Sequence, residues 1–359
     1  MIGTRLKLAR GASGLSLRDL ADAIGNKVSA QAIGKYERDE SMPGSAVLIT
    51  LAGALGTSVE YLLGDHDLVL EAVDFRKKAI ASKREEARVQ AQVLHLLERY
   101  LVIEELLGLP SAEWARPDGA PFPVLQSLAE ADTAAMYVRE QWRLGNDPIP
   151  NLFELLEEKG IKLLAFPLGE EIDGLTANAR RMHRDPVPVV VVNSMHWHER
   201  QRFTLAHELA HKVLDVKPGL DEEKAAHRFA SAFLMPAEPL WSEIGKHRSS
   251  VGWAELFRLK EMFGVSVQAL TYRCKDLGIF SDALFRKLFQ EFIRRGWRKP
   301  PYQEPGALAP RRPCRFERLV LRALSENALS EAKAAEMLEI SVRELSQRMD
   351  EPPVIVSAG

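Results

Sequence analysis

The sequence predicts a mainly α-helical protein with a small α+β domain in its middle and a helical C-terminal region. Apolar residues recur at helical spacing through residues 1–66 and again over 315–349. Three apolar runs, at 161–166, 172–179 and 187–192, have the length and composition of strands. The 359 residues are 46% hydrophobic and 27% charged, which is ordinary for globular proteins and sufficient for two or three cores.

Composition also limits the class of protein. The net charge of −2 indicates no general affinity for nucleic acid, so any basic surface must be local. The only cysteines, Cys274 and Cys314, match no metal-ligand spacing, which is typical of a reducing compartment. The chain starts without an apolar signal segment and has no run of membrane-spanning length. We therefore expect a cytoplasmic protein that does not enter a membrane.

Residues 1–66 form the first expected domain. Short helices are predicted over 4–11, 17–24, 29–38, 44–55 and 58–63. The segments 16–25 and 29–37, joined by the turn from Gly25 to Ser29, resemble the helix-turn-helix of the Xre/Cro repressor family. Residues 51–64 resemble the closing helices of that family. The resemblance implies a domain that binds a double-stranded DNA operator.

By this resemblance, the helix that begins at Ser29 would enter the major groove. Gln31 is then placed to pair with adenine, and Lys35 with guanine or a phosphate. Residues 1–38 contain seven Lys or Arg and three Asp or Glu, so basic residues are concentrated where the groove face is expected. The alternative is a helical protein–protein module with solvated polar residues. The expected DNA-binding residues are Arg18, Lys27, Ser29, Gln31, Lys35 and Arg38.

Residues 67–123 are expected to connect this domain to the next. Asp67 to Leu107 contains no Gly or Pro and predicts a long helix, either packed singly or forming a dimer contact. The Pro- and Gly-rich segment 108–123 predicts a linker. Helices over 124–143 and 151–159, followed by the three strands, predict an α+β domain over 124–280.

The most informative motif is His207-Glu208-Leu209-Ala210-His211. Histidines at i and i+4 on a helix project from one face, so both imidazoles can bind a single Zn²⁺. Glu208 would lie beside the metal, where it can take a proton from a water molecule that the metal activates. The alternative is a buried helix with two hydrogen-bonded histidines. Apolar neighbours and the strand-like run before the helix favour the metal site.

A zinc ion held by two histidines needs a third protein ligand, and a second helix is predicted over 221–234. On that helix Glu223 shares a face with Ala226 and His227, unlike Glu222. The segments RQRFTLAHELAHKVL and EKAAHRFASAFLMP resemble the ImmA/IrrE family of metallopeptidases, as do Ile172–Thr176 and Phe263–Leu270. The resemblance covers residues 125–280. It implies a gluzincin-like fold with His207, His211 and Glu223 as zinc ligands.

His227 departs from the family pattern, which usually has Asn or Asp at this position. It would orient a ligand imidazole or contact substrate. Alternatively, it is a plain surface or core histidine, or a fourth ligand that closes the site. The departure puts catalytic activity in doubt more than zinc binding.

Residues 281–359 are expected to form a basic linker and a helical module. Residues 286–322 contain eleven Lys or Arg and three acidic residues, which suits acidic partners or nucleic acid, or alternatively a solvated linker. Residues 329–348 loosely resemble a second helix-turn-helix, a weak match more typical of packing or dimerisation.

Together these patterns predict a transcriptional regulator with a zinc endopeptidase domain that cuts a partner repressor or antitoxin-like protein. The alternative is a non-proteolytic repressor or antitoxin whose peptidase-like domain senses or binds a partner. A homodimer is one option for either.

Overall fold

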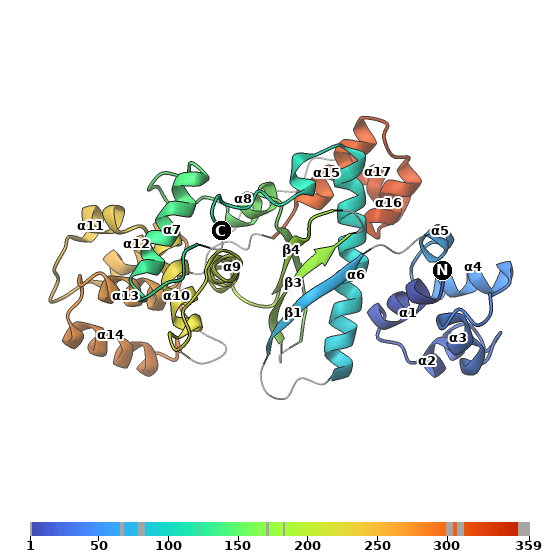
Figure 1. Cartoon of the computed structure of the whole chain (residues 1–359), viewed down its shortest axis with the longest axis horizontal. Helices are drawn as coiled ribbons and strands as arrows, with labels where there is room; N and C mark the ends of the chain where they lie inside the picture. The colour runs from blue at the N-terminus through green and yellow to red at the C-terminus, as the bar shows by residue number, and fades with distance from the viewer. Residues whose placement is uncertain are drawn as a thin grey trace.

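The computed structural model describes residues 2–64, 68–77, 83–120, 122–169, 172–181, 184–298, 304–306 and 312–350. These residues form 17 α-helices and a four-stranded sheet, which confirms the predicted mainly α fold with a small α+β part. Figure 1 shows the N-terminal helices at one end, the sheet in the middle and a helical bundle at the other end. Within this described part, no helix is both long and apolar enough to cross a bilayer.

The N-terminal domain has the five expected helices. Its core contains Leu6, Leu20, Ile33, Leu51 and Leu62, one from each helix. Ser16 and Ser29 cap the second and third helices by accepting hydrogen bonds from backbone amides. The helices are α1 (Ile2–Ala12), α2 (Leu17–Ala23), α3 (Ala30–Glu37), α4 (Ser45–Ala54) and α5 (Val59–Leu63).

The sheet has the strand order β1-β3-β4-β2, in which β2 pairs parallel to β4 and the other pairs are antiparallel. Gly174 is required in β3 because a Cβ there would lie 2.8 Å from the carbonyl oxygen of Val191. The strands are β1 (Val69–Lys77), β2 (Lys162–Phe166), β3 (Ile172–Arg180) and β4 (Val187–Asn193). The last three confirm the predicted strands.

The prediction of one helix over Asp67–Leu107 is wrong in its first part. Val69–Lys77 is strand β1, and α6 begins only at Lys83 and ends at Leu106. Leu70, Val73 and Phe75 pack against the core between the sheet and α6. Leu70 and Val73 are three residues apart, but a bulge between Glu71 and Asp74 places both on the same face of the sheet. β1 covers the edge of β3. A substrate strand cannot pair with β3 in this arrangement, because β3 already has β1 on one side and β4 on the other.

Both faces of the sheet are covered, which explains the unbroken valine run in β4. Val190 and Val192 belong to the core shared with α9 (His198–Val213), whereas Val189 and Val191 belong to the core shared with α6. In Figure 1, α9 and α6 lie on opposite sides of the strands. The helix α9 is therefore held in a fixed position against β4.

Helices on the α9 side form the far bundle. The predicted helices before the strands are α7 and α8, and α14 joins the core of the bundle through Leu288 and Phe292. The packing thus extends past the expected boundary at residue 280. These helices are α7 (Glu130–Gln141), α8 (Leu152–Glu158), α10 (Glu222–Leu234), α11 (Ala237–Ile244), α12 (Trp253–Phe263), α13 (Val267–Asp276) and α14 (Asp282–Arg294).

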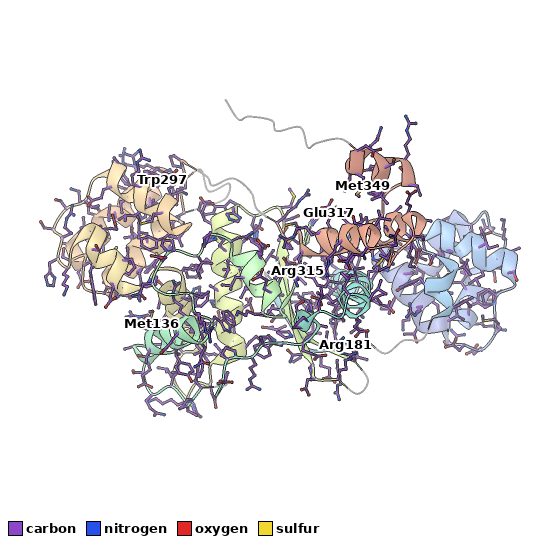
Figure 2. The ribbon with its side chains drawn as sticks, turned by 90° about the horizontal axis from the view of Figure 1, so that it is seen from above. Met136, Arg181, Trp297, Arg315, Glu317 and Met349 are labelled. Atoms are coloured by element: carbon purple, nitrogen blue, oxygen red, sulfur yellow. The ribbon has the colours of Figure 1, made fainter. Side chains whose placement is uncertain are left out.

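The C-terminal helices α15 (Arg315–Ser325), α16 (Glu331–Leu338) and α17 (Val342–Asp350) pack on the end of α6 around Ile103. Figure 2 shows Glu317 and Met349 on these helices, away from the bundle that contains Trp297. Residues 299–303 and 307–311, within the basic stretch 286–322, lie outside the described residues.

Helix α6 contacts the N-terminal domain, the sheet and the C-terminal helices. Arg5 of α1 donates a hydrogen bond to the carbonyl of Tyr61 at 2.9 Å and forms an ion pair with Glu98 of α6. Arg99 of α6 pairs at 3.0 Å with Glu339, the residue that follows α16. The helix is therefore the common support of the N-terminal domain, the sheet and the C-terminal helices.

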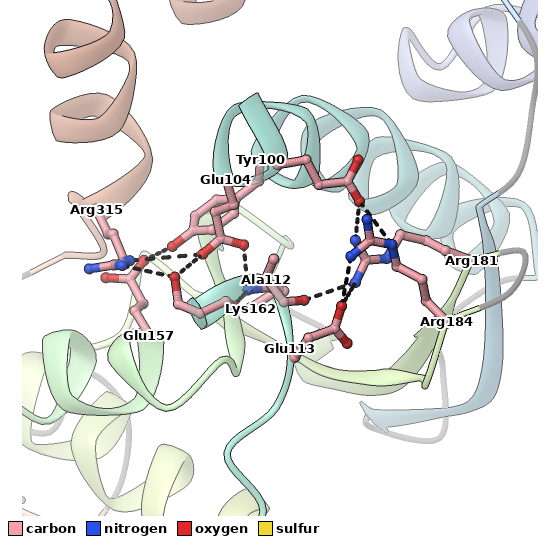
Figure 3. Close-up of polar contacts among 11 residues, drawn as sticks. Tyr100, Glu104, Ala112, Glu113, Glu157, Lys162, Arg181, Arg184 and Arg315 are labelled. Carbon is pink, nitrogen blue, oxygen red and sulfur yellow. Dashed lines mark hydrogen bonds and ion pairs between the residues drawn. The ribbon is translucent and has the colours of Figure 1, made fainter. Parts of the chain in front are cut away.

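A buried polar network fixes α6 to the sheet (Figure 3). The ammonium of Lys162 and the carboxylate of Glu104 are both fully buried, with Nζ and Oε2 2.5 Å apart. Ser111 donates a hydrogen bond to Glu104 at 2.8 Å, and Tyr100 donates one to Glu157 at 3.1 Å. Burial raises the pKa of Glu157 to about 7.

Candidate metal centre

The HExxH residues lie in the second half of α9, where the helix is held between β4 and α10. His207 is fully buried and Glu208 is 4% exposed, whereas the side chain of His211 retains 22% exposure. The site therefore has a dry inner side and an opening near His211. Such a setting strengthens electrostatic interactions while leaving access for a substrate.

The carboxylates opposite these histidines come from the first turn of α10. Asp221 caps this helix, since its Oδ1 accepts a hydrogen bond from the Lys224 amide at 3.0 Å. Glu222 and Glu223 follow directly, where the helix dipole favours negative charge. The cap fixes where α10 begins and therefore where both carboxylates lie.

Three predicted ligands meet in one place. The Nε2 atoms of His207 and His211 are 3.0 Å apart, and Oε2 of Glu223 lies 3.4 Å from Nε2 of His207. Oε1 of Glu223 lies 3.3 Å from Nε2 of His211. Four ligands placed tetrahedrally about 2.0–2.1 Å from a zinc ion are themselves about 3.3 Å apart. The spacing and the donor types of this set fit zinc.

Glu222, which sequence reasoning set aside, also belongs to the site. Its Oε1 lies 3.1 Å from Nδ1 of His211, on the opposite side of the ring from Glu223. A proton on Nδ1 donated to Glu222 leaves Nε2 free as a ligand atom. The sequence signal was the pair of adjacent carboxylates, but their different roles depend on how α10 approaches α9.

Lys212 lies between the motif and the sheet. Its Nζ donates a hydrogen bond to Oδ1 of Asn178 on β3 at 3.2 Å. Burial lowers the pKa of Lys212, and the carboxylates of Glu208 and Asp74 act in the opposite direction. The general-base candidate Glu208 therefore has a cation nearby, and the carboxylate of Asp74 on β1 lies within electrostatic range of the same cation.

His227 is exposed and lies next to a ligand candidate without joining the donor cluster. Its ring meets that of His207 edge-on, with centroids 4.5 Å apart, and stacks on Phe203 at 5.7 Å. Among the described residues, the side chains grouped closely enough for a metal are His207, His211 and Glu223. This placement supports a contact with the ligand or substrate over a role as fourth ligand.

The residues predicted to contact DNA lie on the surface of the N-terminal domain. Gln31 and Lys35 are exposed and one turn apart on α3. Ser29 is the N-cap of α3, Lys27 donates to Oγ1 of Thr50 at 3.0 Å, and Arg38 pairs with Glu40 at 2.6 Å. Arg18 is exposed on α2. Gln31 and Lys35 thus have the open position that a groove contact needs.

Comparison with protein families identifies two domains. Residues 6–62 match the helix-turn-helix family, and residues 156–275 match the IrrE N-terminal-like domain, a peptidase family. The chain thus combines an Xre-like helix-turn-helix domain with an ImmA/IrrE-like domain. Neither the curated proteins nor the solved structures gave a match.

Proposed function

We propose that this chain is a DNA-binding transcriptional regulator whose central domain is a zinc-dependent endopeptidase. The main support is the cluster of two imidazole nitrogens and one carboxylate with separations of 3.0, 3.3 and 3.4 Å. The match of the same segment to a peptidase family supports it independently. A regulator that acts on DNA would work in the cytoplasm.

In this proposal His207, His211 and Glu223 hold the ion. When bound, zinc lowers the pKa of water and polarises a peptide carbonyl. Glu208 accepts a proton from the attacking water and returns it to the leaving amine. Its low exposure of 4% keeps it away from bulk solvent.

The substrate we propose is an extended segment of a partner repressor or antitoxin-like protein. Such segments bind by adding a strand to an open sheet edge. The described edge strand on the side of Lys212 is β1, which carries Asp74. We therefore place the substrate along the outer edge of β1, with its scissile bond over Glu208.

The substitution Glu208→Gln tests this mechanism. Glutamine keeps the size and the metal cluster but cannot take up the proton, so zinc content should persist while cleavage of the partner is abolished. The measurement is mass spectrometry of a partner protein encoded by a neighbouring gene. Unchanged cleavage by the Gln variant would exclude Glu208 as the base.

A second candidate is a non-proteolytic regulator whose peptidase-like domain binds a partner. It is favoured by His227, which replaces the expected Asn or Asp beside His207. A stable, uncut complex between the zinc-loaded chain and its partner would favour this function over the enzyme.

A further inference from the structure

A cavity of about 470 Å³ lies beside the metal cluster, between α9, α10 and α13. Its walls include Phe203 of α9, His227 and Ser231 of α10, and Ala269 and Tyr272 of α13. Ligand pockets in proteins commonly measure about 300–1,000 Å³. The cavity is therefore large enough for a bulky side chain.

The cavity and the metal cluster share a wall. His227 lines the cavity, and its ring centroid lies 4.5 Å from that of His207. Phe203 supports His227 from behind by stacking at 5.7 Å. A peptide held with its scissile bond at the cluster would have a neighbouring side chain at this wall.

The charged groups of the cavity are mutually neutralised. Arg228 lies 2.8 Å from Asp132 and 3.1 Å from Asp276, and Lys224 at the rim lies 2.9 Å from Asp221. A charged ligand group would have to break one of these pairs. The cavity therefore discriminates against charged side chains.

The remaining walls are mostly apolar and partly rigid, although Ser231 adds a hydroxyl group to them. Leu128, Phe203 and Ala269 contribute carbon surface. The ring of Tyr272 is held by Phe285 and Phe289, with centroids 5.1 and 4.9 Å away. Aromatic rings of this kind bind aromatic and large aliphatic groups.

We propose that this cavity binds a large apolar side chain, aromatic or aliphatic, of the substrate residue next to the cleaved bond. His227 is then a specificity-determining residue that separates this pocket from the metal. The inference rests on the proposed function, since it assigns the substrate class of that site.

Filling the cavity tests the inference. Ala269→Trp in the full-length, zinc-loaded chain should occupy the space, whereas Ala283→Trp on the exposed face of α14 is the matched control. On a random peptide library, the native chain and the control should prefer Phe, Tyr, Leu or Met on one side of the cleaved bond. Ala269→Trp should reduce that preference by about tenfold or more. Ala269→Leu, a milder change, should give an intermediate effect.

A binding measurement separates this inference from the proposed function. N-acetyl-phenylalanine amide should give saturation-transfer NMR signals with the native chain and with Ala283→Trp, but not with Ala269→Trp. N-acetyl-glycine amide should give none. Cleavage without side-chain preference would overturn the pocket and leave the peptidase standing. Absence of all cleavage would overturn the peptidase, and the pocket would then be judged by the NMR result. Equal binding of N-acetyl-phenylalanine amide by the native chain and all variants would overturn the pocket.

Discussion

Nδ1 of His211 and Oε1 of Glu222 lie 3.1 Å apart, a contact that orients the imidazole of a proposed zinc ligand from outside the cluster of candidate donors. Glu222→Ala should therefore weaken zinc binding by about 10–100-fold without removing a ligand. Competition with a chromophoric chelator measures this affinity. Lys224→Ala, on the same turn, is the control and should leave the affinity unchanged. Equal affinities for the native chain and Glu222→Ala would refute the orienting role.

The exposed side chains of α3 allow a test of DNA reading. Gln31→Ala and Lys35→Ala should each cost about 1–3 kcal/mol of operator affinity if each loses a base contact. Fluorescence anisotropy on DNA selected from a random pool measures this. Lys287→Ala, an exposed lysine on α14, removes the same charge and should have no effect. If Gln31→Ala and Lys35→Ala also bind normally, α3 is not the reading helix.

Glu157 should make stability depend on pH. Its folded-state pKa of about 7 lies above the ordinary value of 4.5, because burial outweighs the hydrogen bond from Tyr100 and the nearby charges of Arg315 and Arg318. The folded state thus retains a proton that the unfolded state loses, and stability falls as pH rises from about 4.5 to about 7.

Glu157→Gln removes this loss. The variant should gain at most roughly 3 kcal/mol over the native chain above pH 7, and little at pH 4. Urea unfolding at several pH values measures the difference. A difference that does not change with pH would mean that Glu157 titrates normally.

The buried pair of Glu104 and Lys162 should be costly to break. Glu104→Ala leaves an ammonium without its carboxylate between α6 and β2, and we expect a loss of about 3–5 kcal/mol in unfolding free energy. Arg322→Ala breaks an exposed pair with Glu326 and should leave the denaturation midpoint unchanged. The prediction fails if both variants unfold at the native midpoint.

Most of the fold followed from local patterns, since the N-terminal helices, three strands and helix α9 each have their own periodicity. Strand β1 did not, because its partner β3 lies about 100 residues further on and its charged sequence resembles a helix. The role of Glu222 was also missed because it depends on a contact between separate elements. Its contact with His211 depends on how two helices pack, which spacing along one helix does not reveal. The pairing of Glu104 with Lys162 likewise requires α6 to lie on the sheet.

The zinc content of the purified chain tests the central proposal most directly. After loading and dialysis, elemental analysis should find one zinc per native chain and none in Glu223→Ala, while Glu222→Ala at saturating zinc still binds one. A native chain without zinc, or full zinc content in Glu223→Ala, would contradict the proposed metal centre.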